Sequence, residues 1–351
     1  MLDWISERKH PLACIIGGLF AVAILLISTL PVLAQDTSTH PRLKIINGCS
    51  KAISINHVVG AGGGTLTAPN PAILQPSGQT GDSVTFNIPD KGLAGTRFWP
   101  SMKVQCADGS SGCSIGESGG PGLACPGGIG CAPPVDSKFE GTFGCFAAEA
   151  AKGNCQVNPS GNGAPLPETD GWDTSMVDGY TLPYKVEIKG SCPNGPKKNK
   201  IDCSGLSLSQ CPVNEDLSTN GAYPALANED LTLTFPTSSG GATDTQTGCY
   251  SPCSKLTTGN WQNIPNPPFS DGPTTYQPSD PQADYYCCGG SVGVEACRNG
   301  PVVKTSYVKM IHEVCPQTYA YAYDDGTGNF SCPATAETIY EVTFFCPLQD
   351  S

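Results

Sequence analysis

The chain has 351 residues, of which only 14% are charged, and its formal net charge is −12. An acidic protein of this kind is a poor partner for nucleic acid or for an anionic membrane surface, so both classes of function are excluded. The 42 glycines and 32 prolines are typical of loops, but the 19 cysteines indicate that disulfides order those loops. We therefore predict an all-β, loop-rich fold held together by disulfides.

The first segment is typical of an export signal. A basic pair precedes an apolar run over 11–34, which ends in the small-residue pattern Val-Leu-Ala. We predict a signal peptide over 1–34, with Gln35 as the first mature residue and the protein outside the cell; an uncleaved membrane anchor is the alternative. Cys14 lies within the apolar run, so its removal leaves an even number of cysteines, as an oxidising compartment favours.

Alternating apolar and polar residues then predict a series of short strands. We expect the second of them to return on the first as a hairpin. A helix-like segment lies between Cys145 and Cys155, and 206–210 is typical of one turn of helix. The predicted strands cover 43–47, 53–58, 83–88, 96–106, 185–189, 319–323 and 340–345.

The closing stretch 315–346 combines aromatic runs with a turn. Tyrosines alternate with alanines over 319–323, which favours a strand with one aromatic face. Two adjacent carboxylates, Asp324 and Asp325, begin the turn that follows. Asn329 begins the sequon Asn-Phe-Ser, which is an N-glycosylation acceptor only in a eukaryotic secretory route.

The spacing of cysteines and histidines argues against metal sites and histidine-based catalysis. The cysteines over 106–131 are separated by 7, 12 and 6 positions and contain no C-x₂-C pair, so we interpret them as a disulfide knot rather than a zinc site. His40, His57 and His312 are far apart in the chain, which disfavours a catalytic triad. No phosphate loop or dinucleotide fingerprint occurs. We predict no cofactor and no metal.

Several motifs together carry a resemblance to a known family. They are CPQTYAYAYDDGTGNFSCP followed by YEVTFFCP near the end, WDTSMVDGYTLP from Trp172, SGLSLSQCP, the YCC at 286–288 and the EGTF at 140–143. On these motifs, in this order over roughly 43–350, the chain resembles the thaumatin-like proteins (thaumatin, osmotin and pathogenesis-related relatives). It departs from the family in a longer knot and in an extra cysteine pair, Cys145 and Cys155.

The resemblance implies one thaumatin-like domain over 43–351. It would contain a flattened β-sandwich, a disulfide-rich loop lobe over 204–315 and a small knot over 104–131. The sandwich would be built from 43–103, 132–203 and 316–351.

The resemblance also implies a disulfide map, in which the first strand is joined to the last. Such bridges are worth about 2–4 kcal/mol each, so we expect resistance to heat, acid and proteases. The implied pairs are Cys49–Cys346, Cys106–Cys113, Cys125–Cys131, Cys192–Cys332, Cys203–Cys315, Cys211–Cys249, Cys253–Cys287 and Cys288–Cys297, which leaves Cys145–Cys155.

Members of the family have a cleft between sandwich and lobe, lined by one basic residue and four acids. Asp325 is the alternative to the fourth acid. The acids matched by the motifs are Glu140, Asp173, Asp178 and Asp324.

The remaining cleft residues are basic or aromatic. The basic residue is matched by Lys103, with Arg97 as the alternative. Trp172 and Tyr180 would offer flat faces to sugar rings.

Crowded carboxylates raise the pKa of at least one of them, and glycoside hydrolysis requires a protonated acid beside an ionised one. Glu140 would donate the proton and Asp173 would be the second carboxylate.

Some members of the family bind or cleave β-1,3-glucans, and many inhibit fungal growth. We therefore expect a secreted monomer that binds β-1,3-glucan-type polysaccharide in an acidic cleft, with a defence, antifungal or cell-wall role. The alternatives are a weak endo-β-1,3-glucanase and an extracellular module that binds a receptor or acts as an inhibitor of another protein.

Overall fold

The computed structural model of the chain describes residues 38–105, 111–116, 135–235, 245–257, 276–289 and 291–347. The predicted signal peptide over 1–34 lies outside these residues. So do the expected pairs Cys106–Cys113 and Cys125–Cys131, since the knot is largely outside the described ranges. Within these ranges, no helix has the length and apolar character needed to cross a membrane.

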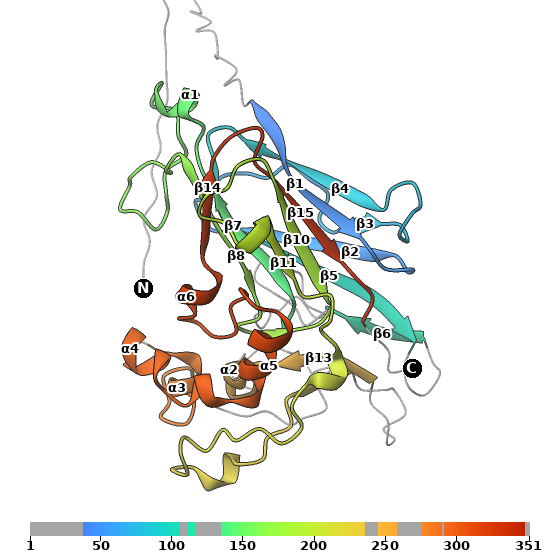
Figure 1. Cartoon of the computed structure of the whole chain (residues 1–351), viewed down its shortest axis with the longest axis vertical. Coiled ribbons are helices and arrows are strands. Elements are labelled where there is room, and N and C mark those ends of the chain that lie inside the picture. Colours follow the sequence, from blue (N-terminus) through green and yellow to red (C-terminus); the bar gives the residue numbers. More distant parts are fainter. Residues whose placement is uncertain are drawn as a thin grey trace, which may run out of the picture. The chain divides into compact units, whose positions relative to one another are not determined.

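Two large sheets make up most of the described structure (Figure 1). The first has the order β11-β10-β15-β1-β4 and the second the order β14-β8-β7-β5-β2-β3, with β6 also paired to β5. The first sheet is formed by β1 (Thr39–Asn47), β4 (Ser83–Pro89), β10 (Tyr184–Lys189), β11 (Lys200–Asp202) and β15 (Ile339–Phe344). The second is formed by β2 (Ile53–Val59), β3 (Ala72–Leu74), β5 (Leu93–Gln105), β6 (Ser111–Ile115), β7 (Lys138–Phe143), β8 (Thr169–Ser175) and β14 (Phe330–Pro333).

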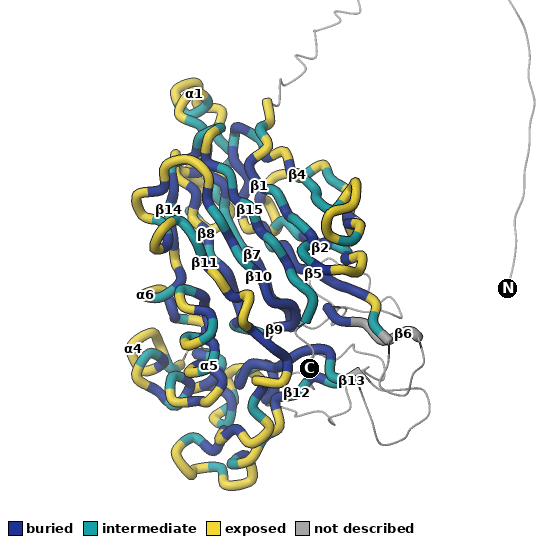
Figure 2. The backbone as a smooth tube through the Cα atoms, turned by 45° about the vertical axis from the view of Figure 1, so that its right-hand side comes forward, coloured by how far each residue is buried: buried dark blue, intermediate teal, exposed yellow. Residues whose placement is uncertain are grey.

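Aromatic side chains fill the space between the two sheets. Tyr340 of β15 has its ring centroid 5.6 Å from that of Phe139 on β7 and 5.2 Å from that of Trp172 on β8. Phe86 of β4 meets Phe98 of β5 at 4.9 Å. The sheets therefore pack face to face as a β-sandwich, and the all-β prediction is confirmed. Figure 2 shows buried backbone along the strands and exposed backbone in the surrounding loops.

The first and last strands are neighbours. β1 pairs with β15 in parallel, with Leu43 opposite Tyr340, and with β4 on its other side. The expected hairpin between the first two strands is wrong, because β2 pairs with β3 and β5 in the opposite sheet. The intervening turn at 48–52 carries the chain from one layer to the other.

Most of the other predicted strands are found, but the strand over 319–323 is wrong. This segment is irregular, and only Tyr319 forms a bridge, to Ser175. The Asp324 carboxylate accepts a hydrogen bond from the Ala320 backbone N–H at 3.0 Å, so this donor is bonded without a strand partner. The predicted helical segments correspond to α1 (Ala147–Ala150) and the 3₁₀ turn η2 (Leu208–Gln210).

A third, small sheet and a group of helices lie together at one end of the sandwich (Figure 1). The longest helix, α5, begins where the buried Glu215 carboxylate accepts hydrogen bonds from the backbone N–H groups of Ser306 (2.9 Å) and Tyr307 (2.8 Å). The sheet contains β9 (Gly179–Tyr180), β12 (Thr232–Phe235) and β13 (Thr245–Tyr250). The helices and turns are η1 (Lys197–Asn199), η3 (Pro224–Leu226), α2 (Pro252–Thr257), α3 (Asp284–Cys287), α4 (Gly293–Arg298), η5 (Val302–Lys304), α5 (Ser306–Val314) and α6 (Asp325–Gly328).

Disulfides connect these parts over long sequence distances. The longest separation is 297 residues, between Cys49 and Cys346 just after β1 and β15. Six bridges in the described residues are pairs that the family resemblance implies, and the seventh, Cys145–Cys155, is the pair that it left over. They are Cys49–Cys346, Cys145–Cys155, Cys192–Cys332, Cys203–Cys315, Cys211–Cys249, Cys253–Cys287 and Cys288–Cys297.

Candidate functional site

The alternation of side chains along three neighbouring strands creates a row of charges. Phe98, Phe139 and Trp172 point into the sandwich, so the residue beside each of them points to the outer face of the second sheet. These outer residues are aligned by strand register: Arg97 of β5 lies opposite Glu140 of β7, and Glu140 lies opposite Asp173 of β8. The row Arg97, Glu140 and Asp173 is therefore a direct consequence of how the strands pair.

Within this row, the basic and acidic side chains contact each other. The Arg97 Nε atom lies 2.5 Å from Glu140 Oε1, and the side chains are 43% and 20% exposed. Partial exposure leaves both groups able to bind a polar ligand.

The row lies on the floor of an open cavity of about 630 Å³. Four glycines border it, and a Cβ atom built on one of them, Gly171, would meet nothing within 4 Å. The glycines therefore leave open space above the charged row. The cavity is lined by Val58, Gly60, Gly95, Thr96, Arg97, Glu140, Gly141, Thr142, Gly171, Trp172, Asp173, Tyr319 and Asn329.

Asp173 has the most perturbed acidity in this row. Burial raises its pKa well above the usual value, and the negative charge of Glu140 raises it further. The positive charges of Lys138 and Arg97 act in the opposite direction. The cavity floor thus holds one carboxyl group that favours its protonated form beside one that is ion-paired.

Lys138 is a functional candidate that the sequence analysis missed. It lies two residues before Glu140 on β7, so both side chains leave the sheet on the same face. Its side chain is only 1% exposed, and its ammonium group forms an ion pair with the Asp178 carboxylate. The alternation Lys-Phe-Glu at 138–140 is the sequence signal that would have identified it.

Asp178 was expected to line the cleft, and the structure places it elsewhere. Its carboxylate neutralises the buried Lys138 ammonium, which would otherwise be an unpaired charge in the interior. Among the described residues, those that line the cavity do not include Asp178.

The two neighbouring acids of the C-terminal turn have different surroundings, and neither is among the described residues that line the cavity. Asp324 is 3% exposed, pairs with His312 Nε2 at 2.7 Å and holds the local backbone. Asp325 is 45% exposed and accepts hydrogen bonds from Tyr319 (2.6 Å) and Arg298 (2.7 Å). Its charge also contributes to the raised pKa of Asp173.

The basic residue also differs from the first expectation. Lys103 lies six residues beyond Arg97 on β5, opposite Ser114 of β6. Of the described residues that line the cavity, Arg97 is the basic one. Arg97, the alternative named from the sequence, is the basic residue that the β5–β7 register places opposite Glu140.

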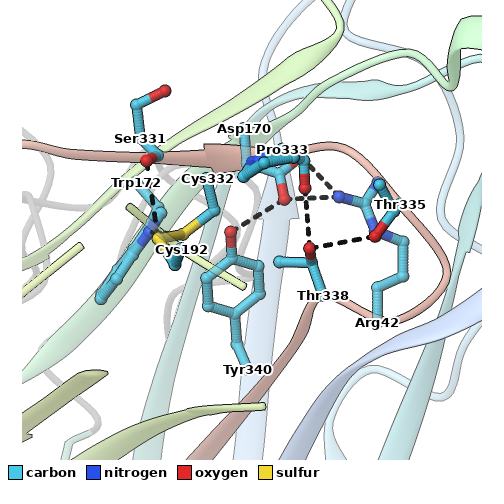
Figure 3. The surroundings of a disulfide bond; sticks show 10 residues. All are labelled: Arg42, Asp170, Trp172, Cys192, Ser331, Cys332, Pro333, Thr335, Thr338 and Tyr340. Carbon is cyan, nitrogen blue, oxygen red and sulfur yellow. Dashed lines mark hydrogen bonds and ion pairs between the residues drawn. A yellow bond between two sulfur atoms is a disulfide. The ribbon is translucent and has the colours of Figure 1, made fainter. Parts of the chain in front are cut away.

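The two aromatic residues expected to contact sugars are core residues. The Trp172 side chain borders the cavity but is 2% exposed, and its ring packs on Phe139 at 5.7 Å. Its Nε1–H points to Cys332 Sγ at 3.3 Å, next to the Cys192–Cys332 bridge (Figure 3). Tyr180 is fully buried and donates its hydroxyl hydrogen to the Ser207 carbonyl oxygen at 2.9 Å.

Tyr319 is the tyrosine that lines the cavity. Its hydroxyl group donates to Asp325, which holds the ring at the edge of the cleft. The residue was noticed in the sequence only as part of a predicted strand. Across the described part of the chain, no group of three or more histidine, cysteine, aspartate or glutamate side chains is arranged to hold a metal ion.

Comparisons with known proteins give a consistent set of relatives. The Thaumatin family model matches residues 275–347. Thaumatin-like protein 1 of Pyrus pyrifolia is 26% identical over 86% of this chain and 88% of the relative. A protein of Prunus avium named glucan endo-1,3-beta-glucosidase is 29% identical over 62% of this chain and 68% of the relative.

The solved structures that match include that of the thaumatin-like xylanase inhibitor TLXI. It is 17% identical, and the match covers 42% of this chain and 76% of that chain with a TM-score of 0.24. A score this low supports no argument about fold or partner.

Proposed function

Because the chain belongs to the thaumatin-like family, we propose that it is an extracellular protein that binds β-1,3-glucan-type polysaccharide in the cleft. The row of Arg97, Glu140 and Asp173 on the cavity floor is the observation that carries this proposal. A guanidinium group donates hydrogen bonds, a carboxylate accepts them and a protonated carboxyl group does both, so the row complements the hydroxyl groups of a sugar chain. A role in defence or in the cell wall follows from such binding.

Two further features support the proposal. The cavity is open, has a volume of about 630 Å³ and includes Tyr319 in its lining. The Prunus avium relative is named for action on 1,3-β-glucan. The many disulfides fit an oxidising compartment such as the exterior of the cell.

Weak endo-β-1,3-glucanase activity is the second candidate function, and a specific observation favours it. The raised pKa of Asp173 beside an ion-paired Glu140 matches the pairing of acid and base that glycoside hydrolysis requires. The roles are reversed relative to the sequence-based expectation: Asp173 would protonate the glycosidic oxygen, and Glu140 would be the second carboxylate. The reversal follows because burial, together with the neighbouring charge of Glu140, raises the pKa of Asp173.

Sedimentation with insoluble β-1,3-glucan, with an assay for released reducing sugar, tests both candidates. We expect Glu140→Gln and Asp173→Asn to weaken sedimentation at least about tenfold, equivalent to roughly 1.4 kcal/mol. Glu187→Gln is the matched control, since Glu187 is also an ion-paired carboxylate on a strand but lies on β10 of the other sheet.

The outcomes separate the alternatives. Sedimentation that survives both cleft substitutions would refute the proposed binding site. Sugar release that is lost in Asp173→Asn would support hydrolysis with Asp173 as the acid, and binding without release would leave a binding protein. If the unmodified protein does not sediment with glucan, the proposed function fails and a protein partner becomes the better hypothesis.

A further inference from the structure

The sequon that begins at Asn329 lies at the cleft, a position that the sequence does not reveal. It is the only Asn-x-Ser/Thr sequence without proline at the middle position in the 351 residues. The structure places Asn329 among the residues that line the cavity, together with Asp173 and Tyr319. The single sequon of this chain therefore lies beside the row of Arg97, Glu140 and Asp173.

The local conformation directs the acceptor outward. Phe330, the middle residue of the sequon, is buried and its ring lies 5.1 Å from that of Trp172. Because side chains alternate along an extended segment, Asn329 and Ser331 then face away from the core. Asn329 is exposed and extended (φ −89°, ψ 120°), and within the described part of the chain its amide group makes no hydrogen bond.

The rest of the sequon is also compatible with modification. The Ser331 backbone is held by a hydrogen bond from its N–H to the Asn194 carbonyl oxygen at 3.2 Å. Its side chain is directed away from the Cys192–Cys332 disulfide (Figure 3). An oligosaccharide on Asn329 therefore displaces no core contact and no disulfide.

We propose that Asn329 is an N-glycosylation site and that its glycan stands at the rim of the cleft. In the transfer step, the Asn329 side-chain nitrogen forms a bond to the anomeric carbon of an oligosaccharide. The bond from that carbon to the diphosphate of a lipid-linked donor breaks, the lipid diphosphate leaves with the electron pair, and the amide loses one proton. The donor is supplied by a eukaryotic secretory pathway.

The position of the glycan has a consequence for ligand binding, and this consequence rests on the proposed function. A branched oligosaccharide attached to a lining residue occupies part of the space that a polysaccharide chain would enter. The glycosylated protein is then expected to bind insoluble β-1,3-glucan more weakly than the unglycosylated protein, by about threefold to tenfold. Glycosylation would thus restrict the cleft to ligands that approach from the side opposite Asn329.

The modification is tested on the full chain secreted from a eukaryotic host. We expect an intact mass above the polypeptide mass, lost on treatment with peptide N-glycosidase, which leaves aspartate in place of Asn329 in a peptide map. Asn329→Gln and Ser331→Ala each remove the sequon and should abolish the added mass. Ser331→Thr preserves the sequon at the same strand position and should retain it. An unmodified Asn329 in both the natural chain and Ser331→Thr would overturn the proposal.

Glucan sedimentation of the same preparations is a separate readout. Tighter binding by Asn329→Gln and Ser331→Ala than by Ser331→Thr supports placement of the glycan over the cleft. Equal binding by all three overturns that placement, while the mass measurement still decides the modification. If none of the preparations binds glucan, the proposed function fails, and the peptide map still decides whether Asn329 is modified.

Discussion

A buried charge pair connects three separate parts of the sandwich (Figure 3). Arg42 of β1 and Asp170 of β8 are 0% and 1% exposed. The Asp170 carboxylate accepts hydrogen bonds from Arg42 Nη2 (2.6 Å), from the Gly144 backbone N–H (2.7 Å) and from the Tyr340 hydroxyl group (2.8 Å). Because these donors come from β1, β15 and the segment after β7, the pair holds both sheets in register.

Substituting Asp170→Asn should strongly destabilise the protein. The change leaves the Arg42 guanidinium group buried without a counter-charge, and breaking a buried pair in this way costs about 3–5 kcal/mol. Asp202→Asn is a matched control, since Asp202 pairs with Lys200 at 2.6 Å on the surface, with side chains 40% and 41% exposed. Exposed pairs contribute roughly 0–1 kcal/mol, so the control should change the free energy of unfolding little.

Removing both charges distinguishes this explanation from a general loss of packing. Arg42 lies over the rings of Phe143 and Phe146, at 5.5 Å and 5.1 Å from their centroids, so methionine suits the same environment. The double variant Arg42→Met with Asp170→Asn should be more stable than Asp170→Asn alone. Equilibrium unfolding in guanidinium chloride, with disulfides intact, measures all four proteins. A loss below about 1 kcal/mol for Asp170→Asn, or a double variant less stable than the single one, would refute the reasoning.

Three other predictions concern the cleft and the Lys138–Asp178 ion pair. Gly171→Leu should leave the free energy of unfolding within about 1 kcal/mol of that of the unmodified protein, because a Cβ atom at this position meets open space. The same substitution should weaken sedimentation with glucan, and Gly171→Ala should weaken it less. Asp173→Asn should stabilise the protein progressively as the pH rises from about 4. In the unmodified protein, the pKa of Asp173 is higher in the folded state than in the unfolded state, so its stability falls as the pH rises from the unfolded-state pKa to the folded-state pKa. The variant lacks this loss. A difference between the thermal midpoints of the variant and the unmodified protein that does not change with pH would contradict the prediction. Lys138→Met should lower the free energy of unfolding by about 1.5–3 kcal/mol, because it leaves the Asp178 carboxylate without its partner. A denaturant midpoint equal to that of the unmodified protein would show that the pair contributes nothing to stability.

The local pattern of the sequence was sufficient for much of the sandwich. Strict alternation at 83–88 and 185–189 predicted strands that the structure contains, because a half-buried strand must alternate apolar and polar side chains. The same reasoning failed for 319–323. There the Ala320 N–H donates to the Asp324 carboxylate, and the segment forms bends and turns and no strand.

The candidate site was predictable only in part. Glu140 and Asp173 were identified from motifs, and strand register brings them side by side. The different surroundings of Asp324 and Asp325 depend on His312 and Arg298, which belong to two helices that no local pattern connects to this turn.

By itself, the sequence determined that this chain is a disulfide-rich β-protein, because alternation, turns and cysteine number are local or compositional properties. Only the tertiary structure decided which charges share a surface. Arg97 rather than Lys103 lies opposite Glu140, and Trp172 turns into the core while Asp173 turns out. The physical reason is that strand pairing between distant segments sets the register, and a shift of one residue sends every side chain to the opposite face.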